Sequence, residues 1–198
     1  MSRLTPKRPE ELTPEQRERH AEVAKVRPAR PDGQIGGPFD PWIRSPELSR
    51  RAMGLGDFIW QRTTLDRRLI ELAILVTGRT WRSNVEWVAH VRYALEFGVT
   101  QATIDDIFKE RRPEGAPEDE RLVYDVTRAL HATRDLPLDL YRRAVARFGE
   151  QGLVELVAVI GFYTFVSMTL NTFDVPMPGV EQPFPRRIPL ERRIGDLE

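Results

Sequence analysis

The sequence predicts an all-α fold, a bundle of six to seven core helices in one domain. Apolar residues recur at steps of three and four over most of the 198 residues, as they do on the buried face of a helix. No stretch alternates apolar and polar residues as a half-buried strand does. Residues that cap helices, such as Thr13, Ser45 and Thr100, stand directly before several of these periodic segments.

The composition excludes several classes of protein. Lys and Arg number 30 and Asp and Glu number 30, so the net charge is zero, which argues against a nucleic-acid binder and gives no reason to expect binding to a membrane. The chain has no cysteine, so it has no disulfide, thiolate nucleophile or cysteine-ligated zinc. The first 20 residues lack the apolar core of a secretory signal, and we therefore expect a cytoplasmic location.

The N-terminal part is expected to lie outside the main helical body. Residues 1–13 are charged and rich in proline, which predicts disorder. A short helix follows over Pro14–Val26. Residues 27–45 contain so many prolines and glycines that they predict a loop. Phe39 and Trp42 are too apolar for a solvated linker, so we expect this loop to lie against the body.

The rest of the chain reads as a series of helices and a tail. A 15-residue apolar run, Leu156–Leu170, is shorter than the roughly 20 residues that span a bilayer, which favours a buried central helix or an oligomer interface. The predicted helices are Pro46 to about Arg62, two helices joined by a short turn within Asp66–Gly98, Gln101 to about Lys109, Glu118–Thr133, Pro137–Phe148 and Gly152–Thr172. We expect three parts: an extension and loop (1–40), a helical domain (41–178) and a Pro-rich tail (179–198).

The two helices within 66–98 carry a candidate proton-transfer site. Glu71 is a carboxylate in a helix that is apolar nearly all round, so it needs a partner or a raised pKa. In the second helix, the steps of three and four place Ser83, Glu86 and His90 on one face. Two plainer interpretations stay open: Ser83 and Glu86 also fit a capping box, and His90 also fits a core histidine bonded to a carbonyl.

The spacing Glu71-x11-Ser83-x2-Glu86-x3-His90 resembles the carboxymuconolactone decarboxylase family, within the alkylhydroperoxidase-D-like superfamily. The peroxidase branch of that superfamily carries Glu-x11-Cys-x2-Cys-x3-His, and this chain has Ser83 and Glu86 where those cysteines fall. The phrase EWVAHVRYALEFGVT is similar to the decarboxylase branch. The resemblance covers roughly residues 40 to 178. It implies an alkylhydroperoxidase-D-like helical bundle that assembles as a homo-oligomer, a trimer or a hexamer.

The resemblance implies a lyase of aromatic catabolism that works without a cofactor. Such an enzyme decarboxylates or isomerises a small carboxylated lactone or a related acid by moving a proton at carbon. A buried Glu–His pair can tune its pKa toward neutrality for that purpose and supply roughly 10²- to 10⁴-fold of rate. We assign catalysis to Glu71, Glu86 and His90. We assign binding of the acid to Ser83, Trp81, Arg82 and Arg79, because an arginine can clamp a carboxylate through two hydrogen bonds.

Two other functions stay open at this point. A non-catalytic ligand-binding or structural member of the fold would carry the same residues in its pocket. Glu86 and His90, four residues apart on a helix, can also hold zinc or iron with a third ligand. His20 and His131 lie in polar stretches and are poor candidates for that third ligand, so we expect no metal.

The absence of cysteine makes one prediction about redox chemistry. Purified protein is expected to show no hydroperoxide reduction with any dithiol donor, because no thiolate exists to attack the peroxide. The measurement is peroxide consumption with metal and haem excluded. Turnover above the buffer blank would overturn this expectation.

Overall fold

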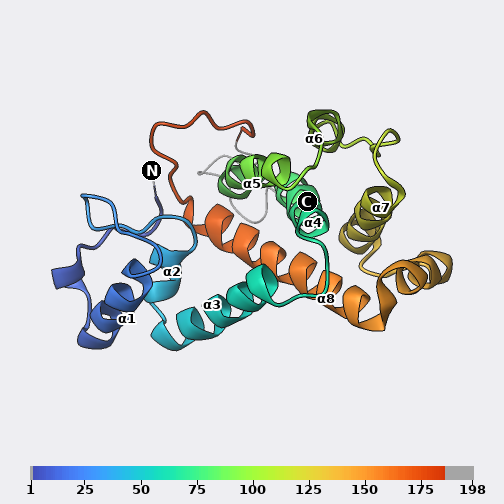
Figure 1. Cartoon of the computed structure of the whole chain (residues 1–198). Helices are drawn as coiled ribbons and strands as arrows, with labels where there is room; N and C mark the ends of the chain where they lie inside the picture. Colours follow the sequence, from blue (N-terminus) through green and yellow to red (C-terminus); the bar gives the residue numbers. More distant parts are fainter. Residues whose placement is uncertain (1, 186–198) are drawn as a thin grey trace, which may run out of the picture.

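A computed structural model describes residues 2–185, and within these residues the fold is all-helical, as predicted (Figure 1). Eight α-helices follow a short 3₁₀ helix at Pro9–Glu11. Their bounds are α1 Pro14–Ala24, α2 Phe39–Ile43, α3 Pro46–Gln61, α4 Arg67–Trp81, α5 Asn84–Glu96, α6 Gln101–Phe108, α7 Glu118–Thr133 and α8 Leu138–Phe173.

Helix α4 is the centre of the bundle. It packs against α5, α6, α7 and α8, and every residue from Leu69 to Gly78 is buried. The helix begins where Asp66 accepts a hydrogen bond from the backbone N–H of Arg68, and it ends at Arg82, which adopts the left-handed conformation. A helix that is apolar nearly all round is stable in water only when neighbours cover every face, and these four helices provide that cover.

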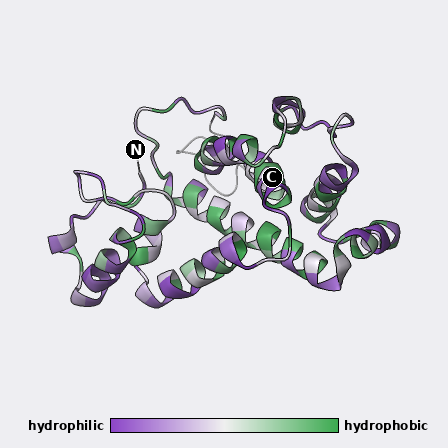
Figure 2. Ribbon diagram, viewed as in Figure 1, coloured by the Kyte–Doolittle hydropathy of each residue, from purple (hydrophilic) through white to green (hydrophobic). Residues whose placement is uncertain are grey.

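Helix α8 crosses the whole molecule beneath α3 and α4 (Figure 1). Gly149 has φ +73° and ψ 169°, which breaks the helix where the sequence predicts the end of one helix and the start of the next. By length and composition α8 is able to span a membrane, but 56% of its most apolar window is buried inside the protein. About half of this apolar stretch, green in Figure 2, therefore belongs to the core, and the cytoplasmic location stays a prediction.

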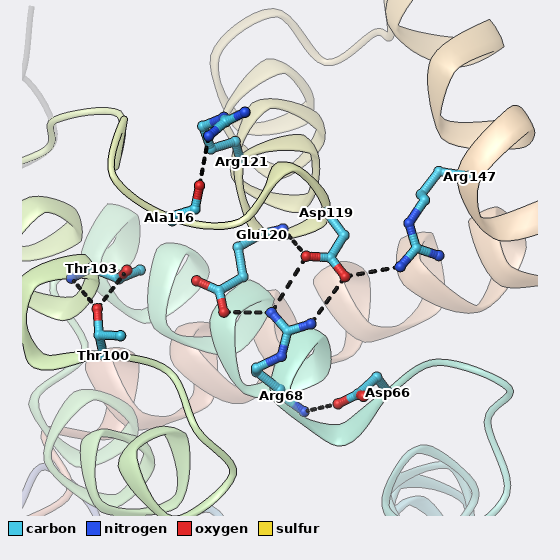
Figure 3. A network of polar contacts seen from close by, with 9 residues as sticks. All are labelled: Asp66, Arg68, Thr100, Thr103, Ala116, Asp119, Glu120, Arg121 and Arg147. Atoms are coloured by element: carbon cyan, nitrogen blue, oxygen red, sulfur yellow. Dashed lines mark hydrogen bonds and ion pairs between the residues drawn. The ribbon is translucent and has the colours of Figure 1, made fainter.

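An ion network with one buried member, Glu120, ties α4 to α7 and α8 (Figure 3). Arg68 donates to Asp119 at 2.9 Å and also to Glu120, which is 1% exposed. Arg147 of α8 reaches the same Asp119 oxygen at 2.9 Å. Removing Arg68 would leave the buried carboxylate of Glu120 without its cation, which is destabilising. The network therefore fixes the start of α4 relative to two other helices.

The N-terminal part is more ordered than the sequence indicates. The predicted disorder of the first 13 residues is wrong for residues 2–13, since Leu12 is buried in a small cluster with Val23 and Ile43. The loop before α3 does lie against the body, but it contains the unpredicted helix α2. Trp42 of α2 stacks on Phe165 with ring centroids 5.2 Å apart, because its apolar side chain finds cover only on α8.

The tail folds back on its own chain. Residues 180–185, which we call the strap, run over the start of α5. Phe184 is buried between Trp87 and Phe108, with ring centroids 5.6 Å from each. Asn84 donates to the carbonyl of Phe184 at 3.0 Å and accepts from its N–H at 2.8 Å. Residues 186–198 of the predicted tail lie outside the described residues, and the three-part division of the chain stays a prediction.

One face of α8 predicts a homo-oligomer. Val154, Val157 and Met168 share that face and are 69%, 46% and 48% exposed. We expect size-exclusion chromatography with light scattering to show a trimer or hexamer, because an apolar stripe of this kind marks an interface. The double variant Val154→Glu/Val157→Glu should move the mass toward the monomer. Val26→Glu, at a 64% exposed site on the N-terminal arm, should not. A wild-type monomer at micromolar concentration would contradict the prediction.

Candidate active site

The site begins with a carboxylate buried in α4. Glu71 has no exposed surface, and both of its oxygens are occupied. Arg67, one turn earlier, donates through Nη2 to Oε1, and His90 Nδ1 lies 2.6 Å from Oε2. A carboxylate in so apolar a helix must be paired, and here α4 supplies one partner and α5 the other.

Helix α5 places Glu86 and His90 one turn apart, on the side that faces α4. His90 Nε2 lies 3.3 Å from Glu86 Oε2, so each ring nitrogen of His90 faces a buried carboxylate. Ser83 is the N-cap residue but makes no side-chain capping bond, and Glu86 does not turn back to the start of its helix. The capping-box interpretation is therefore wrong, and so is the interpretation of His90 as a histidine bonded to a carbonyl.

The pKa of His90 follows from this arrangement. Burial lowers the pKa of His90, but the hydrogen bond to Glu71 and the interaction with Glu86 raise it more, to about 9. The imidazole ring is thus protonated at neutral pH and holds a proton between two carboxylates. A stored proton with a buried acceptor on each side is the kind of group that proton transfer at carbon needs.

Three residues of the site are missed by the sequence analysis. Arg67 lies flat over the Trp60 ring at 3.5 Å, and Trp60 Nε1 donates to the hydroxyl of Tyr163 at 3.2 Å. The Tyr163 ring meets the His90 ring edge-on, with centroids 5.1 Å apart. Burial and the charges of Glu86 and Glu71 raise the pKa of Tyr163 above its ordinary value, so it stays a neutral phenol. Only Arg67 had a signal: its position four residues before Glu71.

The arginines assigned to substrate binding are engaged elsewhere. Arg79 donates to the Phe108 carbonyl at 2.6 Å and to Glu110 at 3.0 Å, and Arg82 donates to the Pro185 carbonyl at 3.2 Å. These bonds hold α6 and the strap, which gives both arginines a packing role. Their role in binding a substrate stays a prediction without a supporting contact.

Ser83 is buried at the start of α5, and Trp81 is half-buried at the end of α4. Ser83 has no exposed surface, and its hydroxyl has no hydrogen-bond partner among the described residues. The same is true of the indole N–H of Trp81, whose backbone carbonyl accepts from Asn171 at 2.8 Å. Both therefore remain candidates for binding a substrate.

Two surface cavities of about 200 and 280 Å³ lie away from this site. One is between the N-terminal segment and the tail, and the other is between α7 and the first half of α8. Within residues 2–185, no group of three or more His, Asp and Glu side chains has an arrangement that holds a metal ion. The site around His90 is thus closely packed in this structure, with Glu71, Glu86 and His90 all less than 7% exposed.

The all-helical fold, with a buried Glu–His pair between α4 and α5, is an alkylhydroperoxidase-D-like bundle. Residues 46–135 match the carboxymuconolactone decarboxylase family, and the chain has no cysteine. Its structure is similar to that of a protein of unknown function from Agrobacterium tumefaciens, described as a candidate AhpD antioxidant defence protein. The two share 20% identity over 73% of this chain and 99% of that one, with a TM-score of 0.64. No curated protein shows a significant match.

The raised pKa of His90 predicts how stability depends on pH. An unfolded histidine has a pKa near 6.5 and the folded one about 9, so the stabilisation is complete below pH 6.5 and is lost as the pH rises through 9. We expect the free energy of unfolding to fall by roughly 3 kcal/mol over that range, measured by urea titration. In His90→Gln this slope should be absent. Burial lowers the pKa of His131, so that residue does not add to the slope. A wild-type curve that is flat from pH 6.5 to 9 would contradict the prediction.

Proposed function

We propose that this protein is a cofactor-independent enzyme that moves a proton at carbon in a small carboxylated lactone or a related acid. The match of residues 46–135 to the carboxymuconolactone decarboxylase family supports this class of enzyme. The observation that carries the proposal is the position of His90, whose two ring nitrogens face Glu71 and Glu86 in a buried site. The reaction is a decarboxylation or an isomerisation.

The two carboxylates take different roles in this proposal. Glu71 accepts from Nδ1 of His90 at 2.6 Å and is itself held by Arg67, so it orients the ring and keeps it protonated. Glu86 Oε2 has no aligned hydrogen bond among the described residues and lies 3.3 Å from the other ring nitrogen. Glu86 and His90 Nε2 are therefore the pair that exchanges a proton with the substrate.

The proton balance is simple for either reaction. In a decarboxylation, the bond between the substrate carbon and its carboxylate breaks, CO₂ leaves, and the electron pair left on carbon takes the proton from Nε2 of His90, which leaves the imidazole neutral. In an isomerisation, the pair removes a proton from one carbon and returns it to another. The dithiol chemistry of the peroxidase branch has no counterpart, because Ser83 and Glu86 stand where that branch has cysteines.

The test uses hydrogen exchange at carbon, which does not require the physiological substrate. Paraconic acid, a γ-lactone with one carboxyl group, is incubated with the protein in D₂O, and loss of the C–H signals next to the lactone carbonyl is followed by NMR. We expect exchange above the buffer rate at pH 7. It should decline above pH 9 as His90 loses its proton.

Variants separate the chemistry from the fold. His90→Gln and Glu86→Gln should each reduce exchange at least a hundredfold while the protein stays folded by circular dichroism. Thr127 belongs to α7, on the far side of α4. Thr127→Ala is therefore the control and should keep the wild-type rate. If wild type exchanges no faster than His90→Gln with paraconic acid and with a panel of related carboxylated lactones, the proposal fails and a non-catalytic ligand-binding role replaces it.

A further inference from the structure

The segment from Trp81 through α5 and helix α8 run in opposite directions. Two contacts show this. Asn171 of α8 donates to the Trp81 carbonyl at 2.8 Å. Two helical turns earlier on α8, Tyr163 meets His90. Ser167 lies one turn from each of these residues, so its side chain falls between the two contacts. The region between α5 and α8 from Trp81 to His90 is about 12 Å long by the rise of the helix.

Several polar atoms in this region are buried without a partner. They are Trp81 Nε1, Ser83 Oγ and Ser167 Oγ, together with Glu86 Oε2, which faces His90 Nε2 at 3.3 Å without an aligned hydrogen bond. We call these four residues the polar seam. A buried polar atom without a hydrogen bond typically costs about 1–3 kcal/mol, and native structures carry few of them. Four on neighbouring turns of facing helices need an explanation beyond packing.

Ser167 differs in this respect from the other buried hydroxyls on helices. Thr127 bonds the carbonyl of Val123, and Thr169 bonds that of Phe165, each one turn earlier. Ser167 has the same opportunity at Tyr163 but makes no such bond among the described residues, although it has no exposed surface. Its hydroxyl is therefore free to donate to a molecule that enters the seam.

The strap closes one end of the seam. The side-chain amide of Asn84 donates to the Phe184 carbonyl and accepts from the Phe184 N–H. Arg82 donates to the carbonyl of Pro185. Asn84 is the residue directly after Ser83, so these bonds pin α5 at the point where the seam begins. The four seam atoms are also out of contact with water, so a molecule reaches them only if this part of the structure opens.

We propose that the polar seam binds the carboxylate and ring oxygens of a small acid, which enters when the strap parts from α5. The indole N–H of Trp81 and the hydroxyls of Ser83 and Ser167 are three donors for the oxygens of such a molecule. A carboxylate held at the Trp81 end places the rest of a small ring toward Glu86 and His90, where the proton is exchanged. This inference rests on the proposed function, since it names the groups that hold that enzyme's substrate.

The test follows the indole N–H of Trp81 by ¹H–¹⁵N NMR. The chain has four tryptophans, and Trp81→Phe assigns the signal. Paraconic acid is the probe, and γ-butyrolactone, the same ring without a carboxyl group, is the matched control. We expect paraconic acid to shift the Trp81 signal saturably and γ-butyrolactone to leave it in place. No saturable shift at Trp81, or an equal shift with both probes, overturns the proposal.

Ser167→Ala should weaken binding of paraconic acid about tenfold, the loss of one hydrogen bond to a carboxylate. Its melting temperature should not fall, because the hydroxyl has no partner in the folded protein. Thr127→Ala, which loses a bond made in the folded protein, should show the reverse: a lower melting temperature and unchanged binding. Ser167→Cys keeps the volume and serves as a second measurement. An unchanged dissociation constant in both Ser167 variants overturns the proposal.

His90→Gln distinguishes failure of this inference from failure of the proposed function. The variant should still bind paraconic acid with a shift at Trp81 while it loses exchange at carbon. Wild-type exchange without any shift at Trp81 overturns the seam alone. A shift at Trp81 that responds to Ser167→Ala, without exchange in wild type, upholds the seam and overturns the proposed chemistry.

Discussion

The buried carboxylate of Glu71 is the constraint on which the site depends. It lies in the second turn of α4, the helix that α5, α6, α7 and α8 cover, and it has no access to water. Such a group must find positive partners inside the protein, and breaking a pair of this kind costs about 3–5 kcal/mol. Arg67 meets the demand from the same helix and His90 from the next. The need to pair Glu71 therefore decides how α5 faces α4 and keeps a proton on His90.

Two adjacent arginines at the start of α4 have different roles: one anchors neighbouring helices and the other holds the site carboxylate. Successive residues of a helix point about 100° apart, so Arg67 and Arg68 face different neighbours. Arg68 joins Asp119 and Glu120 in the network that anchors α7 and α8. Arg67 lies on Trp60 and holds Glu71. The network fixes the first turn of α4, which also contains Arg67. Arg67 in turn holds the buried carboxylate of Glu71 one turn later.

The family resemblance has a physical meaning at two positions. The glutamate and histidine that flank the cysteine pair of the peroxidase branch are present here as Glu71 and His90, and they bond each other. Where the cysteines fall, this chain has a hydroxyl and a carboxylate, neither of which transfers electrons. The same framework that supports thiol chemistry thereby holds a proton between two acids. Its closed packing leaves polar atoms unsatisfied, which is a common feature of binding sites that trade stability for function.

Local periodicity let the sequence alone determine the helices, the placement of Glu86 and His90 on one face, and the anomaly of a carboxylate in an apolar helix. These depend on spacing within one helix, which the chain carries in its own order. Only the tertiary structure decided between the capping box and the site, brought Tyr163 from α8 to His90, and engaged Arg79 and Arg82 in packing. It also formed α2 and turned the tail back over α5, because an apolar residue in a loop, such as Trp42 or Phe184, chooses its place by the surface that covers it. That surface comes from residues about one hundred positions away, so no local pattern reveals it.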